Sequence, residues 1–81
     1  MKLQFANKHM DHRYKVIIQK EAEGGYSVFV PALPGCASMG KTVDDATANI
    51  REAIDLYLED LNADNQAIPA DNIQIVEVEA P

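Results

Sequence analysis

The longest regular pattern of apolar residues lies in the segment TVDDATANIREAIDLYLEDL, from Thr42 to Leu61. Its apolar residues recur every three or four positions, so an α-helix gathers them into one stripe. They are Val43, Ala46, Ile50, Ala53, Ile54, Tyr57, Leu58 and Leu61. The Thr42 hydroxyl can cap the first turn, and Asp44 and Asp45 follow where carboxylates suit the positive end of the helix dipole. The pattern predicts a helix over residues 42–61 with an acidic, solvated outer face.

Three short segments before this helix alternate apolar and polar residues, which is typical of β-strands. These segments are Tyr14–Lys20, Tyr26–Val30 and Cys36–Gly40. The pair Gly24-Gly25 can supply the positive φ angles of a hairpin turn between the first two. Pro34-Gly35 fits a turn with proline in the second position and glycine in the third. The sequence therefore predicts three strands in succession ahead of the helix.

A fourth extended segment, Asn72–Glu79, follows the helix. Its apolar residues slip phase once, near Val76, which indicates a bulge or a strand half covered on both faces. The predicted order is β-β-β-α-β. The simplest architecture that buries the helical stripe is an α+β fold, with one mainly antiparallel sheet and a single helix packed on it.

Composition narrows the class of partner. The 81 residues include 7 basic and 13 acidic side chains, a net charge of −6. Nucleic-acid binding draws most of its affinity from Lys and Arg that neutralise phosphates, so this charge makes direct nucleic-acid binding a poor fit. A basic protein is a better fit as partner. An acidic surface also keeps a small domain soluble, and that simpler explanation stays open.

The first 13 residues show no regular period, and we interpret residues 1–13 as a flexible leader before a domain at 14–81. The His9-Met10 pair is typical of a restriction-site junction, so residues 1–9 are interpreted as a fusion scar. No apolar run approaches the ~20 residues of a membrane helix, and no signal peptide is recognisable, so we expect a cytoplasmic protein.

Several kinds of chemistry are not expected from the residues present. Cys36 is the only cysteine, so no internal disulfide forms, and the Cys and His pairs of a zinc site are missing. A degenerate metal-dependent nuclease could draw on Glu52 and Asp55, three residues apart on the helix, although exposed acidic helices produce such spacings routinely. We expect no enzyme activity, no metal and no cofactor, with Cys36 packed as a small apolar residue.

The motifs taken together resemble one family, the HicB-like antitoxins. The matching pieces, in order and spacing, are Gly24-Gly25-Tyr26, Pro31-Ala-Leu-Pro-Gly-Cys36, Gly40-Lys-Thr42, Asp44-Asp45-Ala46 and Asn49-Ile-Arg-Glu-Ala-Ile54. The resemblance runs from Tyr14 to Leu61, and the last strand is compatible in pattern. It implies a partial ribonuclease-H-like fold in which the fourth strand adds beside the first.

The resemblance also implies a function: an antitoxin of a type II toxin–antitoxin pair that binds and masks a small basic HicA-like ribonuclease. Many members carry a further DNA-binding segment, which is not expected in this chain because it ends directly after the last predicted strand. A domain of this size gains stability by oligomerisation, so we expect a homo-oligomer. The alternative in the same family is an orphan oligomeric HicB-like domain. As the toxin-facing residues we predict exposed acids and one amphipathic anchor: Glu21, Glu23, Tyr26, Asp44, Asp45 and Glu52.

Overall fold

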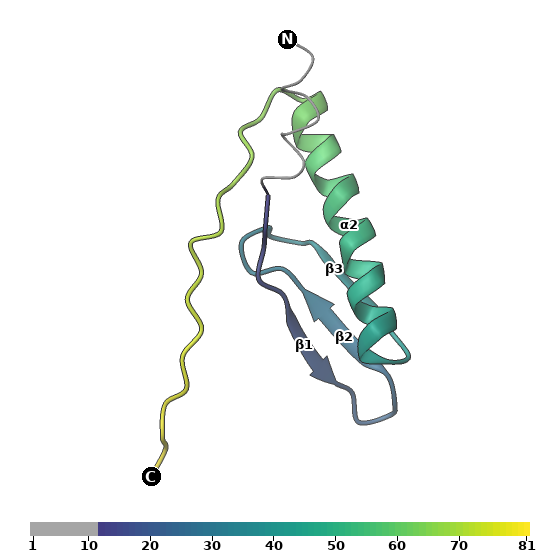
Figure 1. Cartoon of the computed structure of the whole chain (residues 1–81), viewed down its shortest axis with the longest axis vertical. Helices are drawn as coiled ribbons and strands as arrows, with labels where there is room; N and C mark the ends of the chain where they lie inside the picture. Colours follow the sequence, from purple (N-terminus) through teal and green to yellow (C-terminus); the bar gives the residue numbers. More distant parts are fainter. Residues whose placement is uncertain (1–11) are drawn as a thin grey trace.

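The structure is a computed structural model that describes residues 12–81. Three strands, β1 (Ile17–Lys20), β2 (Tyr26–Phe29) and β3 (Ala37–Gly40), form an antiparallel sheet in the order β1-β2-β3. Helix α2 (Val43–Ala63) follows and lies across one face of this sheet (Figure 1). The α+β prediction is confirmed. The predicted leader and fusion scar fall almost wholly outside the described residues.

The register of the sheet separates two faces. Ile18 lies beside Val28, and Val28 lies beside Ser38, so this row points toward the helix. Because side chains alternate along a strand, the neighbouring row points to the opposite face. It contains Ile17, Phe29 and Ala37 side by side, with Met39 one row further along β3. One face of the sheet is therefore covered by α2, and the other carries apolar side chains in the open.

The core lies between the sheet and the helix. It consists of Val28, Val30, Leu33, Cys36, Ala46 and Ile50. Partly buried residues of the helical stripe, including Tyr57 and Leu58, pack around it. This is the stripe that the sequence predicted. The core is small, which is typical of a domain of this size.

The turn between β2 and β3 folds back into the core. The Cys36 N–H donates to the Leu33 carbonyl (3.0 Å), and Gly35 has a φ of 84°. A positive φ at the third position is what a type II turn with Pro34 in second position requires, so this prediction is confirmed. The Tyr57 hydroxyl donates to the Pro34 carbonyl (2.9 Å) and fastens the turn to α2.

The helix begins as the sequence predicts. Thr42 is the N-cap, and its Oγ1 accepts a hydrogen bond from the Asp45 N–H (3.0 Å). Asn49, four residues after Asp45, is a polar amide beside the apolar stripe and needs a hydrogen-bond partner there. Its Nδ2 donates to the Met39 carbonyl in β3 (2.7 Å). The helix is thus tied to the sheet by a polar contact as well as by packing, and it continues to Ala63, two residues beyond the predicted end.

Replacing Thr42 by alanine removes the cap and is expected to lower the free energy of unfolding by about 1 kcal/mol, because the Asp45 N–H loses its acceptor. Chemical denaturation followed by circular dichroism measures this change. Thr42→Ser keeps the hydroxyl and serves as the control. An equal loss in both variants would show that the β-branched side chain matters and the cap does not.

The prediction of a final strand at Asn72–Glu79 is wrong within the described chain. Residues 66–81 form no strand, and their backbone runs alongside the molecule without joining the sheet (Figure 1). Alternation of apolar and polar residues favours an extended chain, but it does not specify a neighbouring strand. The first strand is also shorter than predicted, since pairing begins at Ile17 and Tyr14 only packs beside the core.

Candidate partner-binding surface

The hairpin between β1 and β2 presents two of the predicted acids. The Glu21 N–H donates to the Gly25 carbonyl (3.0 Å) and closes the turn, while Gly24 and Gly25 adopt φ angles of 107° and 80°. The Ser27 hydroxyl donates to the Glu21 carboxylate (2.6 Å), which holds this acid beside β2. Glu23 is exposed at the tip of the turn. The hairpin therefore offers one tethered and one free carboxylate.

The first turn of α2 presents two more predicted acids, Asp44 and Asp45, both exposed. Close packing of glycines brings this turn near the hairpin. A Cβ on Gly25 would lie 3.1 Å from the Gly40 carbonyl oxygen, and one on Gly40 would overlap the backbone of Ala46. The hairpin and the start of the helix thus lie at the same end of the molecule (Figure 1). Acids separated by about twenty residues of sequence therefore lie on segments at one end of the fold.

The other two predicted residues are placed differently. Glu52 is exposed and lies seven residues after Asp45, so both are on one face of α2, about 10 Å apart along the helix axis. Tyr26 begins β2 and is half buried against the core. Its ring is therefore engaged in packing and offers only part of its surface to a partner. The structure places the four acids of the hairpin and helix start at one end of the molecule, with Glu21 held by Ser27 in the row of the uncovered sheet face and the two first-turn acids on the helix that covers the other face. The helix acids continue along α2 to Glu52.

Sequence reasoning missed a set of exposed apolar side chains. Phe29 and Met39 lie on the uncovered face of the sheet and are 44% and 66% exposed. Ile17 beside Phe29 completes this patch. Ile17 was the signal in the sequence for an apolar outer face. An apolar residue at this position does not fit a strand with one buried face and one polar face.

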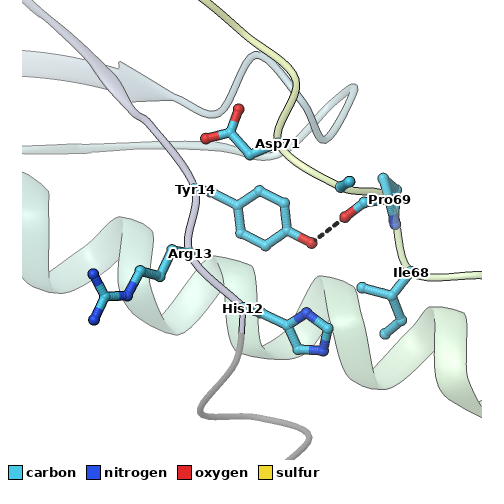
Figure 2. A pocket seen from close by; sticks show the side chains of 7 residues that line it. His12, Arg13, Tyr14, Ile68, Pro69 and Asp71 are labelled. Carbon is cyan, nitrogen blue, oxygen red and sulfur yellow. Dashed lines mark hydrogen bonds between the residues drawn. The ribbon is translucent and has the colours of Figure 1, made fainter.

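A hollow forms where the chain enters β1 and where it leaves the helix (Figure 2). It is lined by His12, Arg13, Tyr14, Ile68, Pro69, Ala70 and Asp71. The Tyr14 hydroxyl donates to the Pro69 carbonyl (2.6 Å). Burial, and then the nearby negative charge of Asp71, raise the pKa of Tyr14. The phenol therefore stays protonated and keeps its role as a donor.

Asp71 fixes the start of the C-terminal segment. Its Oδ2 accepts from the Lys15 N–H (2.7 Å) and faces the Lys15 Nζ (3.3 Å), and its Oδ1 accepts from the Ile73 N–H (3.1 Å). The hydrogen bond from the Lys15 amide is the main cause that lowers the pKa of Asp71. We call these contacts, together with the Tyr14–Pro69 bond, the tail latch.

The lowered pKa of Asp71 predicts a pH dependence of the tail latch. The folded chain binds the Asp71 proton more weakly than the unfolded chain, so the latch contributes stability above the ordinary aspartate pKa of about 3.9. This contribution is lost as the pH falls through the lower folded value. The Lys15 amide resonance should follow the same titration in NMR spectra. In Asp71→Asn its step should vanish, whereas an unchanged step would assign it to another group.

Among residues 12–81, no three His, Cys, Asp or Glu side chains converge as metal ligands would. Cys36 is buried, and burial raises the pKa of its thiol, which confirms that it packs in the core. No helix in the described part of the chain is long and apolar enough to cross a membrane.

Comparison with known proteins shows which protein family this sequence matches. The sequence profile described as "HicB_like antitoxin of bacterial toxin-antitoxin system" matches residues 14–80. A UPF0150 protein of Thermoplasma acidophilum is 50% identical over 68 residues, which cover 84% of this chain and 99% of that protein. A UPF0150 protein of Synechocystis is 45% identical over 62 residues, covering 76% and 78%. One of Helicobacter pylori is 55% identical over 51 residues, covering 63% and 69%.

Proposed function

The chain belongs to the HicB-like antitoxin family of bacterial toxin–antitoxin systems, and we propose that it neutralises a small basic HicA-like ribonuclease by binding and masking it. In this proposal the protein performs no chemistry of its own. Its contribution is a surface that is complementary in charge to the toxin and covers the part of the toxin that contacts RNA.

The observation that supports the proposal is the presence of exposed carboxylates on two segments at one end of the fold. The hairpin acids Glu21 and Glu23 and the helix acids Asp44 and Asp45 lie there, and Glu52 continues the same helix face. An RNA-cleaving protein must attract phosphates, so its RNA-binding surface is basic. A cluster of acids competes for that surface, and opposite charges also speed the encounter of the two proteins.

The test begins with co-expression of the protein and the short reading frame adjacent to its gene. We expect a small basic protein to co-purify in a stable complex. After separation under denaturing conditions and refolding, this partner should cleave RNA, and addition of the antitoxin should suppress cleavage at a stoichiometric ratio. Suppression at a fixed ratio distinguishes masking from slow degradation of the partner.

A partner that cleaves RNA equally well in the presence of excess antitoxin would overturn the proposal. The control is an unrelated acidic protein of similar size and charge. If that protein suppressed cleavage to the same extent, the effect would come from net charge alone, and the assigned surface would lose its support.

A further inference from the structure

The C-terminal segment presents apolar side chains that its own fold does not cover. Beyond the tail latch, Ile75, Val76 and Val78 are 56%, 70% and 83% exposed. Figure 1 shows this segment extended along the molecule from the end of the helix, separate from the sheet. We refer to residues 72–79 as the tail. An extended segment with this composition has the properties of a β-strand without a neighbour.

The sheet offers a matching edge. Among residues 12–81, β1 pairs only with β2. Because the Glu21 N–H bonds to the Gly25 carbonyl, the odd-numbered residues of β1 direct their backbone groups toward β2. Ile18 and Lys20 therefore direct theirs outward, at an edge that can accept another strand. Lys20 at the end of this edge is also opposite in charge to Glu77 and Glu79 of the tail.

With the tail latch formed, the tail does not pair with β1 of its own copy. Asp71 Oδ1 holds the Ile73 N–H and Asp71 Oδ2 holds the Lys15 N–H, so the start of the tail is fixed beside the segment that leads into β1. Residues 72–79 nevertheless join no strand, and among residues 12–81 the outer edge of β1 has no neighbouring strand. A strand supplied by another copy can occupy this edge while the latch stays in place.

We propose that the tail of one copy pairs with the outer edge of β1 in a second copy, and that the exchange is reciprocal. A two-fold arrangement satisfies both edges at once, because each copy supplies the same tail and the same edge. Because side chains alternate along a strand, pairing would partly cover Ile75 on one face and Val78 on the other, which adds apolar contact to a domain whose own core is small. The tail is then the segment that makes the protein a dimer.

The first test is the mass of the full chain in solution, measured by light scattering during gel filtration. We expect a dimer, and a monomer when a stop codon follows Asp71. Ile75→Lys should weaken the dimer by about tenfold or more in dissociation constant, because it places a charge among apolar contacts. Gln74→Lys makes the same change in charge at the neighbouring position and should have a much smaller effect. Circular dichroism verifies that α2 is retained in each variant.

The second test separates exchange between copies from pairing within one copy. Lys20→Cys is placed in a copy with a large solubility tag and Val78→Cys in an untagged copy, and the two are co-expressed and treated with a short bis-maleimide. Exchange predicts a product that joins the tagged and untagged chains. Each variant expressed alone reports any background from the buried Cys36.

Three results would overturn the proposal. These are a monomeric full chain, a dimer that survives removal of the tail, and crosslinking that occurs only inside a single chain carrying both substitutions. Survival of the dimer without the tail would instead assign the interface to the uncovered sheet face around Phe29 and Met39. None of these measurements involves a toxin, so their failure is independent of the proposed antitoxin function.

Discussion

Replacing Gly40 by alanine is expected to lower the free energy of unfolding by about 3 kcal/mol, because the added methyl group meets backbone at the closest contact found among the four glycines. Gly40 ends β3 where the strand passes beneath the first turn of α2. A Cβ on Gly40 would overlap the amide nitrogen of Ala46 and would lie 2.7 Å from the Asp45 carbonyl carbon. Both are backbone atoms, so the clash is relieved only if the helix moves away from the sheet.

The consequence extends beyond local strain. Ala46 is fully buried, and Ile50 lies one turn further along the same stripe, so a displaced helix start opens the core. The Asn49 bond to the Met39 carbonyl would stretch at the same time. Urea denaturation at a fixed protein concentration measures the change, since self-association would otherwise alter the apparent stability.

Gly24→Ala is the matched control. Gly24 has a φ of 107°, yet a Cβ there meets no heavy atom of the described chain within 4 Å beyond its immediate neighbours. This variant carries only the backbone strain, about 1–2 kcal/mol. If Gly40→Ala were no more destabilising than Gly24→Ala, the close approach of β3 and α2 would not persist in solution.

Local sequence signals predicted much of this fold because each acts over a few residues. Thr42 caps the helix through a bond to a residue three positions away, and Pro34-Gly35 closes its turn through the φ angle of one glycine. The helical stripe of Ala46 and Ile50 is likewise a property of one segment. In each case the interaction that fixes the conformation lies within the segment that displays the pattern.

The parts that were not predicted depend on contacts between distant segments. Gly40 is required by the close approach of the Ala46 backbone, a contact that the pattern of β3 does not display. The tail alternates as a strand should but joins no strand, and its start is held by a bond between Asp71 and Lys15, which are 56 residues apart. Alternation contains no information about which edge a strand joins, or in which copy.

The candidate partner-binding surface could likewise be predicted from the sequence only in part. Acidic residues at the hairpin and at the helix start are visible in the sequence, and their exposure is easily anticipated from residue type. That the two segments lie at one end of the fold is not visible, because it follows from the packing of Gly25 against the Gly40 carbonyl and of Gly40 against the helix. Tyr26, predicted as an amphipathic anchor, is half buried against the core, and the sequence did not indicate how much of its ring stays exposed.

Reversing charges at the proposed surface is expected to weaken toxin binding far more than the same reversal elsewhere on the helix. The two variants compared are Glu23→Lys with Asp45→Lys, and Glu59→Lys with Asp60→Lys. Each substitution adds two units of charge, so both variants carry −2 in place of −6 and lose long-range attraction equally. Any difference between them then reports local contact.

For the variant at the hairpin and helix start we expect the dissociation constant to exceed that of the Glu59/Asp60 variant by about tenfold or more, because unlike pairs become like pairs in the interface. The free energy of unfolding should change in opposite directions in the two variants. Asp45 lies in the first turn, where a lysine opposes the helix dipole, whereas Glu59 and Asp60 lie near the end of a helix whose last turn contains no basic residue. Lysine there should stabilise the helix by about 0.3–1 kcal/mol per site.

Because the two variants differ in stability as well as in affinity, folding has to be verified alongside binding. Isothermal titration calorimetry gives the affinities, and urea denaturation verifies that both variants are folded at the temperature of the titration. Equal loss of affinity would mean that the toxin senses only net charge. Greater loss in the Glu59/Asp60 variant, despite its higher stability, would move the toxin-binding surface to the C-terminal half of α2. Greater loss in the Glu23/Asp45 variant would place the toxin at the end of the fold where hairpin and helix meet.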